Sequence, residues 1–425
     1  MLIMLTSCIA SANMVSMDDN ELSDTSGQAL FAINKQTIGL FTYYRMSLDT
    51  SLDLNMNIAS MQLGRTSTGT DISATNVSFG CVADAANNCI TSGSATARSI
   101  LKPFTLTRPY MEFAIKNDGS AVTREVSGIR LGAENVTGPF SIGTLNSFSG
   151  YLSGTTQITM YGTCNDQQGN RFCSGGIPAT PKCGSGSPAY VCGSASAWIG
   201  EPDGLLPNTN MGLVDASATL LGIGAWLHEL AVGFPDATVK DAGGNAVIPV
   251  AATGQRVKYA YINNVNFAGA ISGLVGGITV QRTTSGLGTG LINLLLPILA
   301  SGVTNTISGQ IQNGMNPANP GSVNLNSLTI PYNLKNIHQL DINSANFGLS
   351  FQKEALTYPG YTDASGAAVN MQAGWSMYAK NAFNLLIQQP TWNFTNGITS
   401  GAARNGNIVA LPGPYVNCWG TSAFC

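Results

Sequence analysis

Apolar and polar residues alternate along several segments of the chain, the pattern of half-buried β-strands. The alternation is unbroken over residues 52–58, Leu-Asp-Leu-Asn-Met-Asn-Ile, and it recurs over residues 110–115, 323–330 and 347–351. A period of two residues sends successive side chains to opposite faces of a strand. Strand patterns outnumber helical ones, so we predict a mainly β fold.

Three short segments share a turn-forming composition. In each of them Asp is followed within three residues by Gly, and a Val closes the segment: residues 117–122, 241–247 and 363–369. Asp caps local backbone N–H groups, and Gly adopts the positive φ that tight hairpins need. We therefore predict three hairpin tips. Calcium loops of the EF-hand type are excluded, because acidic residues at alternating positions and a closing Glu are missing.

Helical periodicity is scarcer. Apolar residues recur at intervals of three and four from residue 287 to 311, which predicts one long amphipathic helix over residues 287–316 with a kink at Pro297. The apolar segment 213–230 predicts a further short helix. We expect the long helix to cover an open face of the sheet. The alternative is that it lines a lipid-holding groove.

Eight of the nine cysteines fall into close neighbours. The pairs are Cys81 with Cys89, Cys164 with Cys173, Cys183 with Cys192, and Cys418 with Cys425. This spacing predicts four disulfide-closed loops, which persist in an oxidising compartment. A zinc site is the rival interpretation, but Cys-x2-Cys spacing is absent and the chain has only two histidines, His228 and His338.

The first residues agree with export. Residues 1–12 form an apolar run that ends in Ala-Ser-Ala, a pattern that signal peptidase cleaves, so we predict a signal peptide over this range. The segment Leu5-Thr-Ser-Cys8 also permits a lipoprotein interpretation, in which Cys8 is acylated. No later segment is long and apolar enough to cross ~30 Å of hydrocarbon. We expect an extracellular or cell-surface location, reached through the periplasm.

Composition narrows the class of partner. Charged residues make up 10% of the chain, and the net charge is −3, whereas ordinary soluble domains carry ~25% charged residues. Without a basic patch, nucleic acid is excluded as a partner. A surface with so few charges protects poorly against self-association, which suits a protein that assembles.

The predicted elements follow one another without a linker of distinct composition. A polar leader over residues 13–35 precedes a β-rich region over 36–285, which carries a Cys-rich insertion over 163–194. The predicted helix at 287–316 then leads into a C-terminal β segment over 320–425. We predict one elongated, antiparallel, sandwich-like unit with disulfide-closed loops.

Catalytic constellations are missing from the sequence. His228-Glu229 begins like a zinc-protease helix, but Val232 occupies the place of the second histidine. No nucleophile elbow, phosphate-binding loop or spaced acid and base pair appears. We therefore predict no enzyme, no catalytic residue, no metal and no cofactor. A secreted hydrolase stays open as an alternative, and it requires convergent carboxylates or a Ser and His pair in a cleft.

Aromatic residues gather around one Gly- and Pro-containing hairpin. They are Tyr358, Tyr361, Trp375 and Tyr378. We expect them to pack in the core. If they are exposed, they are suited to stacking on sugar rings or to anchoring a protein partner.

Several segments resemble known secreted proteins. The segments are residues 17–30, with the run Glu-Leu-Ser-Asp-Thr-Ser-Gly-Gln, together with 108–119, 330–338, 347–353 and 412–425. They resemble pilus-system proteins of the Acinetobacter "fil" type, a group of secreted gamma-proteobacterial proteins. The resemblance implies an exported component of a surface filament and implies no catalytic residue. The cysteine-rich residues 164–192 lie outside it.

These observations lead us to expect a structural or adhesive component of an extracellular pilus or filament, assembled through strand edges and apolar contacts. The candidate assembly residues are Ala29, Leu30, Phe31, Ala32 and Ile33. Expected partners are other copies of the chain or sister pilus-system proteins, and a host or surface ligand. A secreted or outer-membrane-associated lipid-binding protein is the alternative function.

Overall fold

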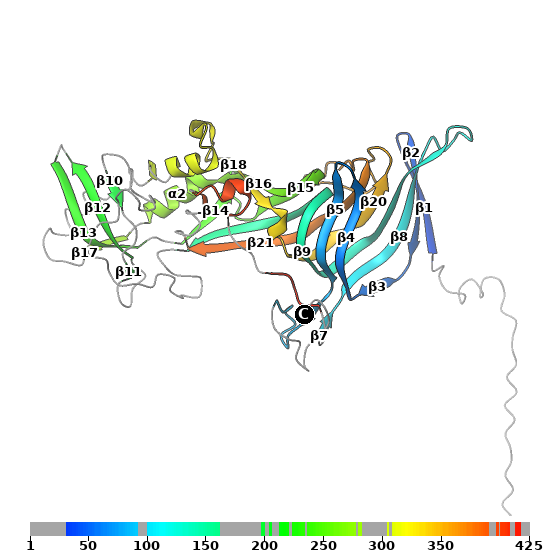
Figure 1. The fold of residues 1–425 in the computed structure, drawn as a ribbon, viewed down its shortest axis with the longest axis horizontal. Coiled ribbons are helices and arrows are strands. Elements are labelled where there is room, and N and C mark those ends of the chain that lie inside the picture. The colour runs from blue at the N-terminus through cyan, green and yellow to red at the C-terminus, as the bar shows by residue number, and fades with distance from the viewer. Residues whose placement is uncertain are drawn as a thin grey trace, which may run out of the picture.

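The fold is mainly β, with one large sheet, as the sequence predicts. The computed structural model describes residues 31–91, 100–161, 197–199, 204–205, 212–220, 223–233, 236–277, 279–282, 304–305, 308–390, 397–398, 400–408 and 413–417. Figure 1 shows an elongated molecule in which the large sheet occupies one end and a smaller sheet the other.

The large sheet contains fourteen of the described strands. They are β1 (Phe31–Ile38), β2 (Phe41–Leu48), β3 (Ser51–Leu54), β4 (Met56–Thr66), β5 (Gly69–Phe79), β8 (Phe104–Lys116), β9 (Glu125–Tyr161), β14 (Ala237–Asp241), β15 (Ile248–Val257), β16 (Tyr259–Asn266), β18 (Leu328–Asn333), β19 (Gln339–Ala345), β20 (Gly348–Gln352) and β21 (Gly374–Pro390). All their pairings are antiparallel except that between β21 and β9, which is parallel.

The remaining elements are short. Two strands form a small ribbon, β6 (Cys81–Ala83) and β7 (Ile100–Lys102), and five form the smaller sheet: β10 (Ala197–Ile199), β11 (Gly204–Leu205), β12 (Gly212–Leu220), β13 (Ile223–Gly233) and β17 (Thr279–Arg282). The helical elements are α2 (Phe267–Gly276), residues 304–305, 308–315 and 397–398, and the 3-10 turns Pro320–Ser322, Leu334–Asn336 and Ala403–Asn405. No described helix is long and apolar enough to cross a membrane.

Strand β9 organises the large sheet. It runs for 37 residues and pairs with β5, β8, β14, β15, β19, β20 and β21. Its first half lies between β8 and β20, and its second half lies between β15 and β21. Two glycines with positive φ, Gly138 at +118° and Gly150 at +121°, interrupt the regular strand geometry.

Most strand predictions are confirmed. The alternating segments at 52–58, 110–115 and 347–351 coincide with β3 and β4, β8 and β20. In the fourth segment, 323–330, the strand begins only at Leu328, because a 3-10 turn and a loop precede it.

Two of the three predicted hairpin tips are correct. Residues 117–122 join the paired strands β8 and β9, and Asn117 adopts a φ of +53°. Residues 363–369 close a hairpin in which the Asp363 carboxylate accepts hydrogen bonds from the N–H groups of Ser365, at 2.8 Å, and Ala367, at 2.9 Å.

The third tip is wrong. Strands β14 and β15 flank residues 241–247, and both pair antiparallel with β9, one after the other along its length. The two strands therefore run in the same direction, and the chain does not reverse between them. The segment protrudes as a loop. The Asp241 carboxylate still caps the loop by accepting the N–H of Asn245 at 2.7 Å. Turn composition therefore dictated the local geometry but not the direction of the following strand.

The predicted helix over 213–230 is also wrong, because this segment forms the antiparallel strands β12 and β13. The register pairs Leu220 with Ile223, so the chain reverses where the helix was expected. Glycines at positions 222 and 224 account for the difference, since each costs about 1 kcal/mol in a helix interior.

The single long helix over 287–316 is not what the structure shows. Residues 304–305 and 308–315 are helical, residues 283–303 and 306–307 lie outside the described part of the chain, and a separate helix, α2, precedes the range. Helix α2 buries Phe267, Ile271 and Leu274 against the sheet core. Its glycines at 269, 273 and 276 explain why the sequence pattern does not predict it, because Gly is a poor helix former.

We predict that Gly150→Ala lowers the free energy of unfolding by roughly 2–4 kcal/mol. The residue has a positive φ, and an added Cβ would overlap the backbone of Met377 on β21. Gly119→Ala is the matched control, since its φ is ordinary and its Cβ would meet open space; we expect a change below about 1 kcal/mol. Denaturant unfolding measures both, and equal stabilities would contradict the role of Gly150.

Candidate assembly surface

Strand β1 lies at the end of the large sheet (Figure 1). All eight of its residues pair with β2, from Phe31 opposite Leu48 to Ile38 opposite Phe41. No other described strand pairs with β1. Its outer edge therefore presents the backbone N–H and C=O groups that do not point toward β2, and such an edge is a template for another strand.

The candidate assembly residues lie partly in this strand. Phe31, Ala32 and Ile33 pair within the same chain, with Leu48, Ser47 and Met46. Ala29 and Leu30 lie outside the described residues. The segment proposed as a strand donor is therefore bound in cis on one side, and it leaves an open edge on the other.

One face of the sheet next to this edge is apolar and exposed. The register places Ile33, Met46, Met111 and Leu131 in one row across β1, β2, β8 and β9. Their exposed fractions are 78%, 43%, 37% and 46%. Directly paired residues share a face, so the four side chains form a continuous outward row, which we call the apolar row. Contiguous exposed apolar surface commonly marks an interaction site.

A neighbouring outward row extends this surface. Ile129 on β9 pairs with Phe351 on β20, which in turn pairs with Trp375 on β21. The rings of Phe351 and Trp375 pack with centroids 5.4 Å apart, and Ile129 and Phe351 are exposed. Aromatic side chains are favoured at protein interfaces.

The opposite face of the same strands buries charge. A second row in the register contains Arg45 on β2, Glu112 on β8 and Arg130 on β9. Each of these residues is adjacent in sequence to a member of the apolar row, so its side chain points to the opposite face. The Glu112 carboxylate accepts a hydrogen bond from Arg45 Nε at 3.0 Å and one from Arg130 Nη2. Arg130 also donates from Nη1 to the carbonyl oxygen of Pro359 at 3.1 Å. The side chains of Arg130 and Glu112 are 0% and 2% exposed.

Tyrosine rings surround the buried guanidinium. The Arg130 Cζ atom lies 5.1, 4.9 and 4.5 Å from the ring centroids of Tyr110, Tyr358 and Tyr361. The negative faces of these rings attract the cation, most strongly where water is excluded. The Tyr361 ring stacks in turn on Tyr378, with centroids 3.9 Å apart. We call this group the arginine–tyrosine cluster.

Glycines make room for the tyrosines. A Cβ atom added at Gly128 or Gly348 would overlap the hydroxyl group of Tyr358 or Tyr361, and one at Gly132 would crowd the ring and hydroxyl of Tyr110. Any larger residue at these positions would expel the ring from the cluster. The inward face of the sheet thus leaves space for the tyrosine rings around Arg130.

The structure accounts for the predicted aromatic group. Tyr358, Tyr361 and Tyr378 are each 1% exposed, so the prediction of core packing is confirmed for them. Trp375 differs, because it lies half-buried on the outward face.

A disulfide anchors a second region. Cys81 and Cys89 are bonded, and the other six paired cysteines lie outside the described residues. The loop that they close holds the segment 413–417: the N–H of Val82 donates to Val416 at 2.7 Å, and the N–H of Val416 donates to Ile90 at 2.8 Å.

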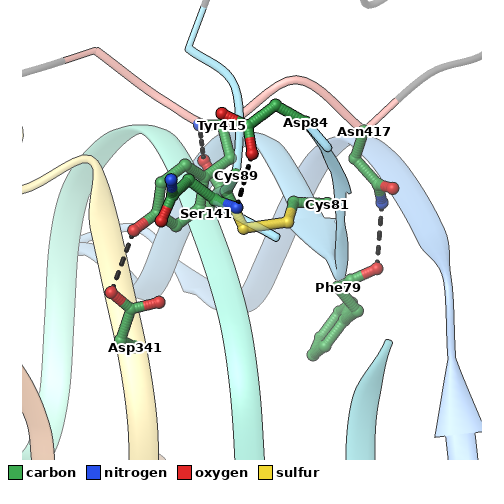
Figure 2. Close-up of a disulfide and its surroundings, with 9 residues drawn as sticks. Phe79, Cys81, Asp84, Cys89, Ser141, Asp341, Tyr415 and Asn417 are labelled. Atoms are coloured by element: carbon green, nitrogen blue, oxygen red, sulfur yellow. Dashed lines mark hydrogen bonds between the residues drawn. A yellow bond between two sulfur atoms is a disulfide. The ribbon is translucent and has the colours of Figure 1, made fainter. Parts of the chain in front are cut away.

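Figure 2 shows how this segment is tied to the sheet. The N–H of Tyr415 donates to Ser141 Oγ at 2.9 Å, and its hydroxyl donates to Asp341 Oδ2 at 3.0 Å. Asn417 Nδ2 donates to the carbonyl oxygen of Phe79 at 2.9 Å. Four separate strands or loops thereby meet beside the disulfide.

The two histidines lie on different elements of the fold. The backbone at His228 belongs to β13, and it is not helical as expected. His338 Nδ1 lies 3.3 Å from the carbonyl oxygen of Ile142. Among the residues whose positions are described, no group of three His, Cys, Asp or Glu side chains could hold a metal ion.

We predict that Glu112→Ala lowers the free energy of unfolding by about 3–5 kcal/mol, because it leaves the buried Arg130 charge without its carboxylate. The control is Glu125→Ala, which removes an exposed pair with Lys353 at 3.7 Å and should cost less than about 1 kcal/mol. Urea denaturation compares the two variants. A loss at Glu112 no larger than that of the control would contradict the importance of the buried pair.

A second prediction concerns alkaline pH. Burial, followed by the Glu112 charge, raises the pKa of Tyr43 from 10.0 to about 12, and burial also raises the pKa of Tyr110 and Tyr361. The folded state therefore holds these protons more tightly than the unfolded chain does. Stability should be constant with respect to these groups below pH 10 and fall as the pH rises from about 10 to 12. Unfolding followed at several pH values, with tyrosinate absorbance, tests this; ionisation of all tyrosines of the folded protein with a midpoint near pH 10 would contradict it.

Known proteins provide no relative for this surface, since no family model, curated protein or solved structure matches the chain.

Proposed function

We propose that the protein is a structural component of an extracellular filament of the pilus type, in which the outer edge of β1 binds an extended segment of a second copy. The observation that carries the proposal is the exposure of β1. Its residues are exposed almost throughout, and Ile33 is 78% exposed at the end of the apolar row. An added strand gains backbone hydrogen bonds and covers apolar side chains at the same time.

The exposed side chains of β1 restrict which segment of a second copy can pair with it. A strand placed beside β1 continues the apolar row beyond Ile33, so it needs an apolar residue at that register position and apolar residues at alternate positions around it. Polar residues suit the other face. The chain contains several segments with this alternation, including residues 52–58.

The charge on β1 does not protect the edge. Natural sheets commonly use lysine on an edge strand to prevent pairing, and Lys35 is the charged residue of β1. Its ammonium group, however, lies 3.1 Å from Asp118 Oδ2 and 5.0 Å from the centroid of the Tyr44 ring. Lys35 is thus directed back onto its own sheet, where its charge is compensated.

Symmetry decides whether pairing gives a filament. Two β1 strands pairing with each other would make an isologous contact, which ends at a dimer. Pairing of β1 with a different segment of the next copy is a head-to-tail contact, and a head-to-tail contact that does not close generates a filament. The low charge content of the chain, 10%, offers little repulsion between successive copies.

The Cys81–Cys89 disulfide and the resemblance of several segments to secreted pilus-system proteins support an extracellular setting for this assembly.

We predict that Ile33→Lys lowers the association constant between copies by at least about tenfold, since it places an uncompensated charge on the edge and in the apolar row. Light scattering and electron microscopy of the purified protein measure the size of the assemblies. Leu386→Lys is the matched control, because Leu386 is an exposed apolar residue on β21, at 51%, away from β1.

Three outcomes would contradict the proposal. These are filaments of unchanged length in Ile33→Lys, equal weakening in both variants, and a wild-type protein that stops at a dimer. Circular dichroism and thermal unfolding verify that the variants are folded.

A further inference from the structure

A polar groove lies on the outside of the sheet, remote from the apolar row. It consists of three hollows of about 260, 420 and 510 Å³ that meet at Asp341, a residue that lines all of them. Ligand sites typically occupy ~300–1,000 Å³. The second and third hollows each fall within this range.

Strand β19 forms the floor of the groove. Gln339, Asp341 and Asn343 alternate with the buried residues Leu340 and Ile342, so the three polar side chains point outward together. The hollow of about 260 Å³ extends on one side over β9 and β21. The hollow of about 510 Å³ extends on the other side over β8 and β9, where Thr105 pairs with Thr137.

The disulfide loop and the segment 413–417 form the opposite wall. Figure 2 shows Tyr415 beside Asp341 and near the Cys81–Cys89 bond. The hydroxyl of Tyr415 donates to Asp341 Oδ2 at 3.0 Å, and Gln339 Nε2 donates to the carbonyl oxygen of Gly413 at 2.5 Å. Covalent and hydrogen-bonded anchors thus hold this wall before any ligand binds, which reduces the entropy lost on binding.

Many amide and hydroxyl side chains contribute to the lining, beside apolar surface from Phe383, Pro103 and Ile342. The amides are Asn87, Asn88, Gln339, Asn343, Asn381 and Asn384, and the hydroxyls are Thr91, Thr105, Thr137, Thr155 and Tyr415. The charged lining residues are Asp341 and Lys102, whose charges cancel. Amides carry both donors and acceptors, and so do the hydroxyl groups of sugars.

Several of these groups have unused hydrogen-bonding capacity. Within the described part of the chain, Asp341 Oδ1 and the side chains of Lys102 and Asn343 make no hydrogen bond or ion pair. Two strands, β19 and β7, therefore direct a free acceptor, a free amide and a free ammonium donor into one groove. The half-buried ring of Tyr415 adds an apolar face between them.

We infer that this groove binds a neutral oligosaccharide. The lining complements hydroxyl groups, and the Tyr415 ring offers a surface for the C–H face of a sugar. Other ligands fit less well: one lysine is too little for a phosphate backbone, and one carboxylate is too little for a metal ion. An acyl chain would leave the amide and hydroxyl groups of the lining without hydrogen-bond partners. The inference is independent of strand-edge assembly. If both hold, the protein is an adhesive component as well as a structural one.

The test uses the full-length protein and a printed panel of neutral oligosaccharides built from glucose, galactose, mannose and N-acetylhexosamines. Binding partners found on the panel are then titrated by calorimetry. We expect at least one oligosaccharide to bind, and we expect Asn343→Ala and Lys102→Ala each to weaken it about tenfold, as the loss of one hydrogen bond in a site does.

Both variants should keep their thermal stability, because neither side chain bonds to another described residue. Asn326→Ala is the matched control: it removes an exposed asparagine amide outside the groove and should leave the affinity unchanged. The inference is overturned if no oligosaccharide on the panel binds, if the two groove variants bind as tightly as the wild type, or if the control weakens binding equally. Assembly measured on the same samples shows separately whether strand-edge contacts persist.

Discussion

The buried charge of Arg130 constrains how the large sheet is built. The Arg130 guanidinium is removed from water, and such a charge is tolerated only with a matched carboxylate and further polar or aromatic partners. Glu112 supplies the carboxylate, and tyrosines on β8 and the 356–371 hairpin supply the rings. The hairpin and the strands β2, β8 and β9 are therefore held together by charge and ring contacts as well as by apolar packing. These contacts join parts of the chain that are distant in sequence.

The same arrangement explains the exposed apolar surface. Side chains alternate across a strand, so a buried Arg130 forces its neighbours Ile129 and Leu131 outward. A monomer gains nothing from exposing them, whereas the proposed assembly would cover them. The same strand register places Arg130 and Glu112 on the inward face and the apolar row on the outward face. A shift of one residue in that register would exchange the two faces.

Sequence patterns predicted the strands well but not which face of each strand is buried. The period of two in 110–115 and 347–351 identified β8 and β20, because alternation is a local property. The usual preference for apolar residues inside would bury Ile129 and Leu131 and expose Arg130, and the fold does the opposite, since its compensating partners are distant in sequence. The groove at Asp341 was missed for the same reason: Lys102, Asp341 and Tyr415 carry no shared motif, and only the fold brings them together.

The position of the 413–417 segment has a consequence for the order of folding. Val82 and Ile90 depend on Val416 for hydrogen bonds, so the ribbon around the Cys81–Cys89 bond is completed by residues made far later during synthesis. Contacts of such sequence separation form slowly. Until they form, the backbone groups of this ribbon remain available to other chains, so the last residues made decide when this part of the surface closes.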